Sequence, residues 1–179
     1  MVLILSIGVL ASTKATDLQA VIDAIESKKL NAKIKVLISN KKDAYALERA
    51  KKHNIDAVFI DSKGKGREEF DKEVAKELEK HSVDLILLIG YMRILSPWFV
   101  NKYKNKIMNI HPSLLPKFRG PTPVQSAILS GDKETGVSII KLDEKMDHGP
   151  ILAQETEVIS DEDTAESLHI KLFTKGANM

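Results

Sequence analysis

Apolar runs and amphipathic helical patterns alternate along the first 111 residues, and this alternation is the feature that most limits the fold. Short runs rich in Val, Ile and Leu predict strands at 2–10, 34–38, 57–60, 83–89 and 107–111. Helical spacing of apolar residues predicts helices at 17–28, 42–53 and 67–80, with a short one opened by Ser96-Pro97 and ending at Tyr103. Such alternation is typical of a three-layer α/β fold, in which an open, mostly parallel sheet carries helices on both faces.

The remaining third of the chain predicts one helix at 123–129 and two strands, at 137–142 and 151–158. We expect these strands to be antiparallel additions to the sheet near the C-terminus. Thr164 to Met179 is predicted to be a helix without a clear stop signal, which is typical of a chain that continues further. No repeat or linker divides the sequence, so we expect residues 1–179 to form a single domain that is truncated at its C-terminal end.

Charge and cysteine content exclude several classes of function. Lys and Arg number 27, Asp and Glu 25, and the net charge of +2 is not that of a dedicated nucleic-acid binder. The absence of cysteine excludes disulfides, thiol nucleophiles and Cys-ligated zinc, and it suits a reducing, cytoplasmic setting. Val2 to Ala11 is apolar, but no basic segment precedes it and it is too short to span a bilayer, so we expect no membrane partner.

Ligands of open α/β sheets bind outside the carboxyl ends of the strands, which here are 11–17, 39–43, 90–96 and 109–120. At the last of these ends, Asn109 and His111 are two apart on a strand, so their side chains share one face. Pro112 lacks a backbone N–H and should end regular pairing. An amide beside an imidazole can stabilise a developing oxyanion. The alternative is a strand end with a buried histidine whose hydrogen bonds are satisfied.

The first strand-to-helix turn, Ser12 to Asp17, lies where backbone N–H groups and the helix dipole favour an anion. The turn contains no glycine, and neither the dinucleotide fingerprint nor the phosphate-loop motif is present. Two interpretations therefore stay open at this point. The turn is either a phosphate site or a plain capped start of a helix.

Two further loops carry candidate residues. Gly90 to Leu95 could hold a flat heterocycle by its backbone, with Met92, Leu95 and Val100 as walls, or could simply pack under a helix. In the polar loop 143–150, Asp147 is a carboxylate that the fold could bring beside His111, or it is an ordinary turn residue. For His148 we expect a solvated turn position, because no second histidine lies at ligand spacing.

Two segments resemble the signatures of the folate-dependent formyltransferases, which move a formyl group from 10-formyltetrahydrofolate to an amine. They are N-I-H-P-S-L-L-P-K-F-R-G at 109–120 and M-D-H-G-P at 146–150, and nearly forty residues lie between them. The resemblance covers essentially the whole chain and implies a Rossmann-like formyltransferase fold. It also implies that Asn109, His111 and Asp147 form the catalytic trio.

The middle of the chain is similar to the branch of this family that formylates glycinamide ribonucleotide in purine synthesis, notably at 16–24, 39–50, 67–71 and 90–97. By that resemblance, the first turn binds the acceptor's phosphate. The residues implied there are Ser12, Thr13, Lys14, Ala15, Thr16 and Asp17, with Pro112 and Ser138 as further substrate contacts. The folate site is implied to involve Met92, Arg93, Leu95, Val100 and the backbone from Asp143, with Arg67 near its mouth.

The sequence departs from that branch in two places. Thr13 and Ala15 stand where the branch has glycines, and Asp17 stands where asparagine is common; a carboxylate repels a phosphate, and Lys14 would offset this. G-P-T-P-V-Q-S-A-I at 120–128 lacks two histidines that are usual in the branch. It is similar instead to the branch that formylates methionyl-tRNA.

The resemblance implies direct attack of the acceptor amine on the formyl carbon, with no metal. Asn109 and His111 would stabilise the oxyanion, Asp147 would orient His111 and assist proton transfer, and Ser138 would support a water. We expect small-molecule substrates, a folate and a phosphorylated amine, no nucleic acid, and a monomer or homodimer. The alternatives are a formyltransferase for methionyl-tRNA or an amino sugar, a hydrolase that releases formate, and a non-catalytic folate-binding homologue.

Overall fold

The computed structural model of the chain describes residues 4–15, 17–143 and 148–179. It divides into two compact units, Met1–Ile107 and Met108–Met179, called here the first and second units. The first unit contains β1 (Leu5–Ala11), α1 (Leu18–Glu26), β2 (Ala32–Ser39), α2 (Tyr45–Lys52), β3 (Asp56–Phe59), α3 (Arg67–Lys80), β4 (Leu85–Leu88) and α4 (Pro97–Lys102). The second contains α5 (Pro123–Leu129), β6 (Glu134–Lys141), β7 (Ile151–Val158) and α6 (Ala165–Asn178), and β5 (Ile107–His111) starts at the boundary.

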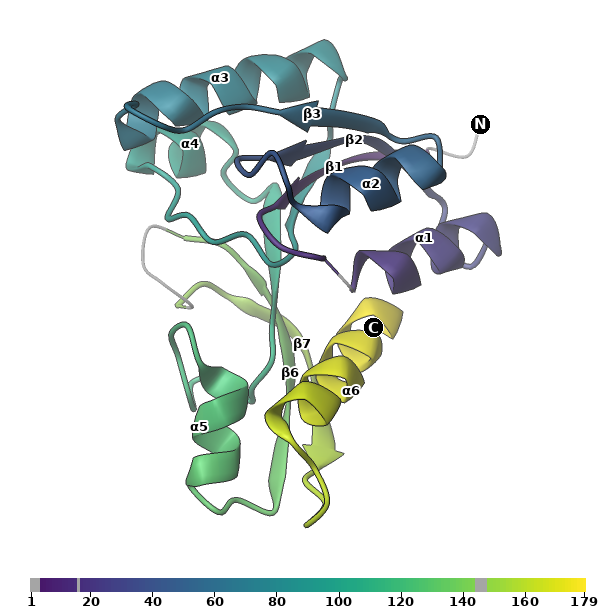
Figure 1. Cartoon of the computed structure of the whole chain (residues 1–179), viewed down its shortest axis with the longest axis vertical. Helices are drawn as coiled ribbons and strands as arrows, with labels where there is room; N and C mark the ends of the chain where they lie inside the picture. The colour runs from purple at the N-terminus through teal and green to yellow at the C-terminus, as the bar shows by residue number, and fades with distance from the viewer. Residues whose placement is uncertain (1–3, 16, 144–147) are drawn as a thin grey trace. The chain divides into compact units, whose positions relative to one another are not determined.

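Four parallel strands form the sheet of the first unit, in the order β3-β2-β1-β4. The central strand β1 pairs with β4 from Ile7 to Leu10, and these residues are almost all buried, as a strand covered on both faces requires. The connections from β1 to β2 and from β2 to β3 run toward one edge of the sheet. The connection from β3 to β4 crosses back to the other edge. Right-handed crossovers therefore place α1 and α2 on one face and α3 on the other (Figure 1).

The helices of the first unit bury the apolar stripes that their sequences predict. On α3, Phe70, Val74 and Leu78 are buried at helical spacing. The short helix α4 starts as expected, because the Ser96 hydroxyl accepts a hydrogen bond from Phe99 N (3.2 Å) and Pro97 follows at the first helical position.

Antiparallel strands form the sheet of the second unit, where β6 pairs with β5 on one side and β7 on the other. One face of this sheet is covered by α6, which approaches closely at Gly176. A Cβ atom at this position would lie 2.7 Å from Ile110 Cγ2 and 2.8 Å from Val137 Cγ2. Gly176 is therefore the residue that permits this close packing of helix on sheet.

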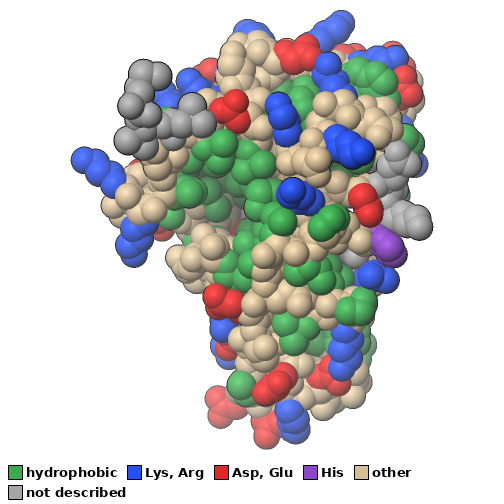
Figure 2. Space-filling model, turned by 180° about the vertical axis from the view of Figure 1, so that it is seen from behind, with side chains coloured by type: hydrophobic (Ala, Val, Ile, Leu, Met, Phe, Trp, Pro, Cys, Tyr) green, Lys and Arg blue, Asp and Glu red, His purple; other side chains and the backbone are tan. Residues whose placement is uncertain are grey.

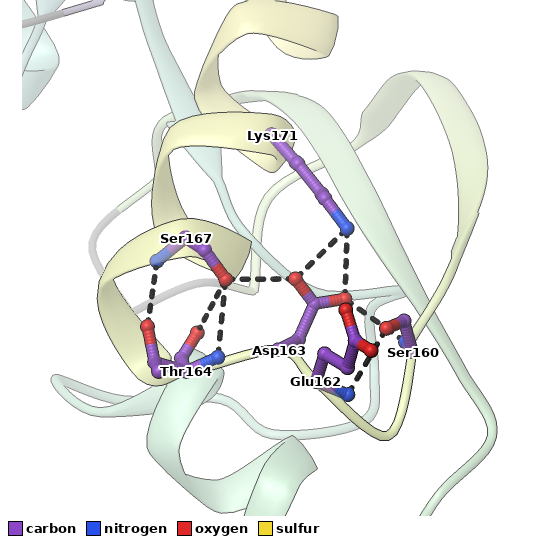
Figure 3. A network of polar contacts seen from close by, with 6 residues as sticks. All are labelled: Ser160, Glu162, Asp163, Thr164, Ser167 and Lys171. Carbon is purple, nitrogen blue, oxygen red and sulfur yellow. Dashed lines mark hydrogen bonds and ion pairs between the residues drawn. The ribbon is translucent and has the colours of Figure 1, made fainter.

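Polar side chains fix the start of α6 (Figure 3). Thr164 Oγ1 accepts from Ser167 N (3.1 Å), and Ser167 Oγ accepts from Thr164 N (3.0 Å), which is a reciprocal capping arrangement. The carboxylate of Asp163 accepts from Lys171 Nζ (2.8 Å), Ser167 Oγ (2.7 Å) and Ser160 N (2.9 Å). These bonds, that of Lys171 foremost, lower the pKa of Asp163 to about 2.

The α/β class expected from the sequence is confirmed, with parallel strands first and antiparallel strands near the C-terminus. Several boundaries differ from the prediction by one to three residues, and two of these differences have a clear cause. The second helix begins at Tyr45 rather than at residue 42, because Ala44 is still extended (ψ 121°). The strand β6 begins at Glu134 rather than at Val137, since its first residues are not apolar but already pair with β7.

The surface carries mixed charge, as the net charge of +2 suggests. On the face shown in Figure 2, Lys and Arg side chains are interspersed with Asp and Glu. Within the described ranges, the helices are all too short or too polar to traverse a lipid bilayer.

Candidate functional site

The hydroxyl of Ser12 joins three strand ends of the first unit. It donates to Asn40 Oδ1 (2.7 Å), just past the end of β2, and accepts from Met92 N (2.9 Å), in the loop after β4. The Ser12 backbone N–H also donates to Gly90 O (3.1 Å). The prediction that the carboxyl ends of these strands meet is therefore confirmed for the first turn, the turn after β2 and the loop 90–96.

Thr13 lies directly over Gly90. A Cβ atom at Gly90 would collide with the Thr13 hydroxyl, and Gly90 has a left-handed φ of 58°. The backbone carbonyl of Thr13 accepts from Ala46 N (3.3 Å) of α2. Where the resembling branch has a glycine, this chain thus has a side chain that fills the space beside the loop 90–96.

Ala15 takes the backbone conformation that glycine normally provides, with a φ of 45°. Its N–H contacts the Thr13 hydroxyl (3.3 Å), and its carbonyl accepts from Leu18 N (3.1 Å) at the start of α1. The turn is therefore shaped by a strained alanine. Of the other predicted phosphate ligands, Lys14 is exposed, and Thr16 lies outside the described residues.

Asp17 precedes α1 and is only 7% exposed. Burial raises its pKa to about 7, against the lowering effects of a backbone hydrogen bond and of the Arg49 guanidinium. Near neutral pH, part of the population therefore carries a protonated, uncharged Asp17. This reduces the repulsion between this carboxyl group and an anion in the turn.

The loop 90–96, predicted to take part in folate binding, presents apolar side chains to the surface. Met92 is 69% exposed and Ile94 is 56% exposed, whereas Leu95 and Val100 are each only 7% exposed. The latter two are core residues, which matches the packing alternative considered for them. The Arg93 guanidinium lies over the Phe70 ring (4.4 Å to its centroid).

Asn109 and His111 share one face of β5, as predicted. Asn109 is opposite Ile140 and His111 is opposite Ser138 in the antiparallel pairing with β6, so both belong to the same set of alternating positions. Asn109 is half-buried, and His111 is 4% exposed. Pro112 is buried immediately after the strand.

His111 is held by the loop that follows it. Its Nε2 lies 3.0 Å from the backbone carbonyl oxygen of Phe118, a residue with a left-handed φ of 55°. A carbonyl can only accept a hydrogen bond, so Nε2 carries the hydrogen in this arrangement. In the neutral ring, Nδ1 is then the nitrogen with the lone pair.

The loop between His111 and α5 is anchored on Ser138, which is fully buried. The Ser138 hydroxyl donates to Ser113 O (2.6 Å) and accepts from Leu115 N (3.1 Å) and Gln154 Nε2 (2.8 Å). Gln154 also donates to Leu115 O (3.0 Å), so residues of both β6 and β7 hydrogen-bond the loop. These bonds give Ser138 a structural role, and its expected contact with substrate or water stays a prediction.

The remaining predicted residues are placed as follows. Asp147 lies outside the described residues, so its position beside His111 stays a prediction. Asp143 is about half-exposed, with its Oδ2 3.8 Å from His148 Nδ1, and His148 is solvated as expected. Arg67 is the exposed first residue of α3. Among the described residues, no three His, Cys, Asp or Glu side chains are positioned to hold a metal ion.

Sequence reasoning missed Asn40, Phe118 and Gln154. Each acts through a partner that is distant in sequence or through a backbone atom, and so leaves no local pattern. Only for Gln154 did the sequence offer a signal, and this was its residue type. Gln154 is an uncharged polar residue in a strand, with Glu155 and Glu157 on the alternate positions.

In the first unit a polar turn lies at the ends of parallel strands, where open-sheet α/β proteins bind their ligands. In the second unit an Asn-His pair lies at the end of β5. The chain belongs to the formyl transferase family, whose sequence pattern matches residues 5–179. The family resemblance inferred from the sequence is therefore confirmed.

Among known relatives, the chain is 43% identical over 166 residues to the phosphoribosylglycinamide formyltransferase of Haemophilus influenzae, covering 92% of this chain and 78% of that one. It is 47% identical over 165 residues to the trifunctional purine biosynthetic protein adenosine-3 of Chironomus tentans, which is 90% of this chain but only 12% of that protein. In structure it is similar to glycinamide ribonucleotide transformylase 1 of Symbiobacterium toebii, with a TM-score of 0.94 and 34% identity over 98% of this chain and 84% of that one.

Proposed function

We propose that this chain transfers the formyl group of 10-formyltetrahydrofolate to the primary amine of glycinamide ribonucleotide, in the synthesis of purines. The observation that carries the proposal is the Asn109-His111 pair on one face of β5, with His111 buried and oriented by Phe118. It is supported by the identity of 43% to a relative with that name, which extends over 92% of this chain.

In the proposed reaction the acceptor amine attacks the formyl carbon directly. The developing oxyanion is stabilised by the Asn109 amide and by a ring N–H of His111, held in place before the reaction begins. Because Nε2–H of His111 is directed at Phe118 O, the stabilising N–H is assigned to Nδ1 of the protonated ring. Asp147 is assigned to support that protonated ring and to assist transfer of the amine's proton to the folate nitrogen, which leaves when its bond to the formyl carbon breaks.

The acceptor's phosphate is assigned to the first turn. The left-handed Ala15 lets the chain turn sharply ahead of α1, and the exposed Lys14 supplies a positive charge. Asp17 weakens the site when it is ionised and tolerates phosphate when it is protonated. Acceptor binding should therefore be stronger below pH 7 than above it.

The folate donor is assigned to the loop 90–96. Exposed Met92 and Ile94 offer apolar surface to the ring system, and the core residues Leu95 and Val100 hold the loop in position. Arg67, exposed at the start of α3, is assigned to the carboxylates of the folate tail. The residues present therefore fit a pterin with an anionic tail.

The location, the oligomeric state and the partners of the protein are part of the same proposal. We infer a cytoplasmic enzyme that acts as a monomer or homodimer on small molecules, without metal, membrane or nucleic-acid partners. What supports this is the absence of cysteine and the net charge of +2.

A steady-state assay tests the proposal. Purified protein is given 10-formyl-5,8-dideazafolate and glycinamide ribonucleotide, and release of the deformylated folate is followed with and without the acceptor. Acceptor-dependent turnover that is lost in His111→Ala supports the proposal. Formate release without acceptor would identify a hydrolase, transfer only to methionyl-tRNA would identify a different acceptor, and tight folate binding without turnover would identify a binding protein.

A further inference from the structure

A row of hydrogen bonds joins α1 to α2 beside the first turn. Arg49 Nη1, on α2, donates to Gln19 Oε1 (2.6 Å), on α1. Gln19 Nε2 lies 3.3 Å from His53 Nε2, and His53 Nδ1 lies 2.9 Å from Glu26 Oε1. The His53 side chain is 24% exposed at one end of the row. At the other end is Asp17, whose pKa is raised by burial and lowered by the Arg49 guanidinium.

The orientation of the Gln19 amide determines which nitrogen of His53 carries the hydrogen. A guanidinium can only donate, so the Gln19 oxygen must face Arg49. The amide nitrogen also donates to Asp23 Oδ1 (2.9 Å), which requires the same orientation. His53 Nε2 therefore faces an NH2 group and must accept. The hydrogen of the neutral ring is then on Nδ1, where Glu26 accepts it.

His81 provides a comparison in the same unit, because it follows α3 as His53 follows α2. Its Nδ1 lies 2.8 Å from Glu77 O and its Nε2 lies 3.0 Å from Asp56 Oδ2. Both partners accept, so a protonated His81 keeps both hydrogen bonds. A protonated His53 would instead direct an Nε2–H at the NH2 group of Gln19, and two donors cannot bond.

Protonation of His53 therefore forces a change at Gln19. The hydrogen bond between a protonated ring and the Glu26 carboxylate is charge-assisted, so the ring is held more firmly than before. The Gln19 amide must then turn over or withdraw into solvent. In either case its oxygen no longer faces Arg49, and the guanidinium loses this hydrogen bond.

We propose that His53 is a pH sensor for the first turn, and that Gln19 and Arg49 are positioning residues that transmit its state to Asp17. Histidine is the side chain whose charge normally changes between pH 5 and 8. At higher pH, neutral His53 keeps Arg49 on Gln19, where the guanidinium stabilises the ionised Asp17. At lower pH, protonated His53 releases Arg49, and Asp17 gains its proton more readily. The two protonations are therefore coupled.

Other charged groups lie on the elements packed around His53. Two of them have partners elsewhere, since Asp56 is bound by His81 and Lys52 Nζ donates to Tyr45 OH (3.0 Å). The charged residues are Asp23 and Glu26 on α1, Arg49, Lys51 and Lys52 in the last turn of α2, Lys33 and Lys35 on β2, and Asp56 on β3.

Crystal structures at pH 8 and pH 5 test the release of Arg49. We expect the Arg49–Gln19 hydrogen bond at pH 8 and a separation of more than about 3.5 Å at pH 5. Nitrogen-15 NMR at pH 8 should show the ring proton of His53 on Nδ1. An unchanged Arg49–Gln19 bond at pH 5, or a neutral ring with its proton on Nε2, would overturn the inference.

Carbon-13 NMR of the Asp17 carboxyl group tests the coupling. In wild type its titration should be steeper than that of one independent proton. His53→Ala should give a one-proton curve with a midpoint about half a pH unit lower, because Arg49 stays bound at every pH. Gln19→Ala frees Arg49 at every pH, so its midpoint should lie above that of His53→Ala.

His81→Ala is the matched control for this titration and should reproduce the wild-type curve, since His81 has no bond to the row. Identical Asp17 curves in wild type and His53→Ala would overturn the coupling. A similar change in His81→Ala would also overturn it, because the effect would then not depend on the row.

The consequence for the acceptor rests on the proposed function. The KM for glycinamide ribonucleotide should rise from pH 6 to pH 8 by a factor about three times larger in wild type than in His53→Ala, with equal kcat. Equal factors would overturn this consequence. A wild-type protein that does not use this acceptor at any pH would contradict the proposed function, and the Asp17 titration would then decide on the sensor alone.

Discussion

The Nε2 atom of His111 lies 3.0 Å from the backbone carbonyl oxygen of Phe118, seven residues later in the chain. The histidine that stabilises the proposed oxyanion is therefore oriented by a main-chain atom that no side-chain substitution at position 118 removes. Phe118 has a left-handed φ of 55°, unusual for a bulky residue, and this conformation accompanies a carbonyl directed at the imidazole. Backbone strain is thus located at the candidate catalytic group.

Replacement of His111 by alanine should lower kcat by about 10² to 10³, the usual effect of removing one donor to an oxyanion, with little change in the Kd for the folate analogue. Steady-state assays of folate release measure kcat, and calorimetry measures the Kd for the folate analogue. His148→Ala is the matched control, because this histidine is solvated. In wild type, nitrogen-15 NMR of the neutral ring should show the proton on Nε2; a ring protonated only on Nδ1 would contradict the assignment.

Stability should fall as pH rises from about 4 to 7, because of Asp17. Its pKa is about 7 in the folded chain and near 3.8 in the unfolded one, so between these values the folded state holds a proton that the unfolded state has released. At about 1.4 kcal/mol per pH unit, the loss is on the order of 4 kcal/mol. Asp17→Asn should match wild type in urea unfolding at pH 4 and exceed it at pH 8. Parallel pH profiles for the two proteins would rule out this role of Asp17.

Ala15→Gly should raise the free energy of unfolding by about 1 kcal/mol, since glycine adopts a left-handed φ without the steric cost that alanine bears. The same change should lower the KM for the acceptor if the turn binds its phosphate, because the backbone becomes more accessible. Urea unfolding and steady-state kinetics measure the two effects. Ala24→Gly, in the ordinary right-handed helix α1, is the control and should be destabilising. A loss of stability in Ala15→Gly would contradict the strain assigned here.

Ser138→Ala should destabilise the second unit by about 1–3 kcal/mol, because Leu115 N and Gln154 Nε2 lose an acceptor in a buried place. We also expect faster proteolysis within residues 112–120, detected by mass spectrometry. Ser126→Ala provides the comparison, since the Ser126 hydroxyl donates to the nearby Thr122 O at the start of α5. Equal stability of the two variants would show that Ser138 does not anchor the loop.

Gly176→Ala should be destabilising although alanine favours helices by about 1 kcal/mol. The added Cβ would lie within 3 Å of Ile110 Cγ2 and Val137 Cγ2, on stiff β-branched side chains that cannot turn away cheaply. Thermal unfolding is the measurement, with Thr174→Ala, at an exposed position of α6, as the control. A higher melting temperature for Gly176→Ala would mean that the helix shifts without cost.

Local periodicity was sufficient for much of the fold. The helix α3, the helix α5 and the strands β5 and β7 have the bounds that the apolar pattern predicts, because these segments have strong periods and clear ends. The same reasoning placed Asn109 and His111 on one face, since strand alternation is a property of the backbone alone. Short polar strand starts, such as Glu134 in β6, gave no such signal.

The support around the site could not be predicted in this way. Gln154 contacts Leu115 across 39 residues of sequence, because the antiparallel register of β6 and β7 places Gln154 opposite Ser138, whose hydroxyl accepts from Leu115 N. The left-handed turn at Ala15 is equally hidden, because alanine normally marks a right-handed helix and glycine was the residue to look for. Such features depend on tertiary packing, which overrides local preference.

The Ser12 hydroxyl connects the first turn to the loop 90–96, because it donates to Asn40 Oδ1 and accepts from Met92 N. Thr13 adds to this connection, because its side chain fills the space above Gly90. A segment taken from a relative and grafted into this turn would therefore disturb the loop 90–96 as well. If the turn binds the acceptor and the loop binds the donor, as proposed, a substitution that changes specificity for one substrate should also change affinity for the other.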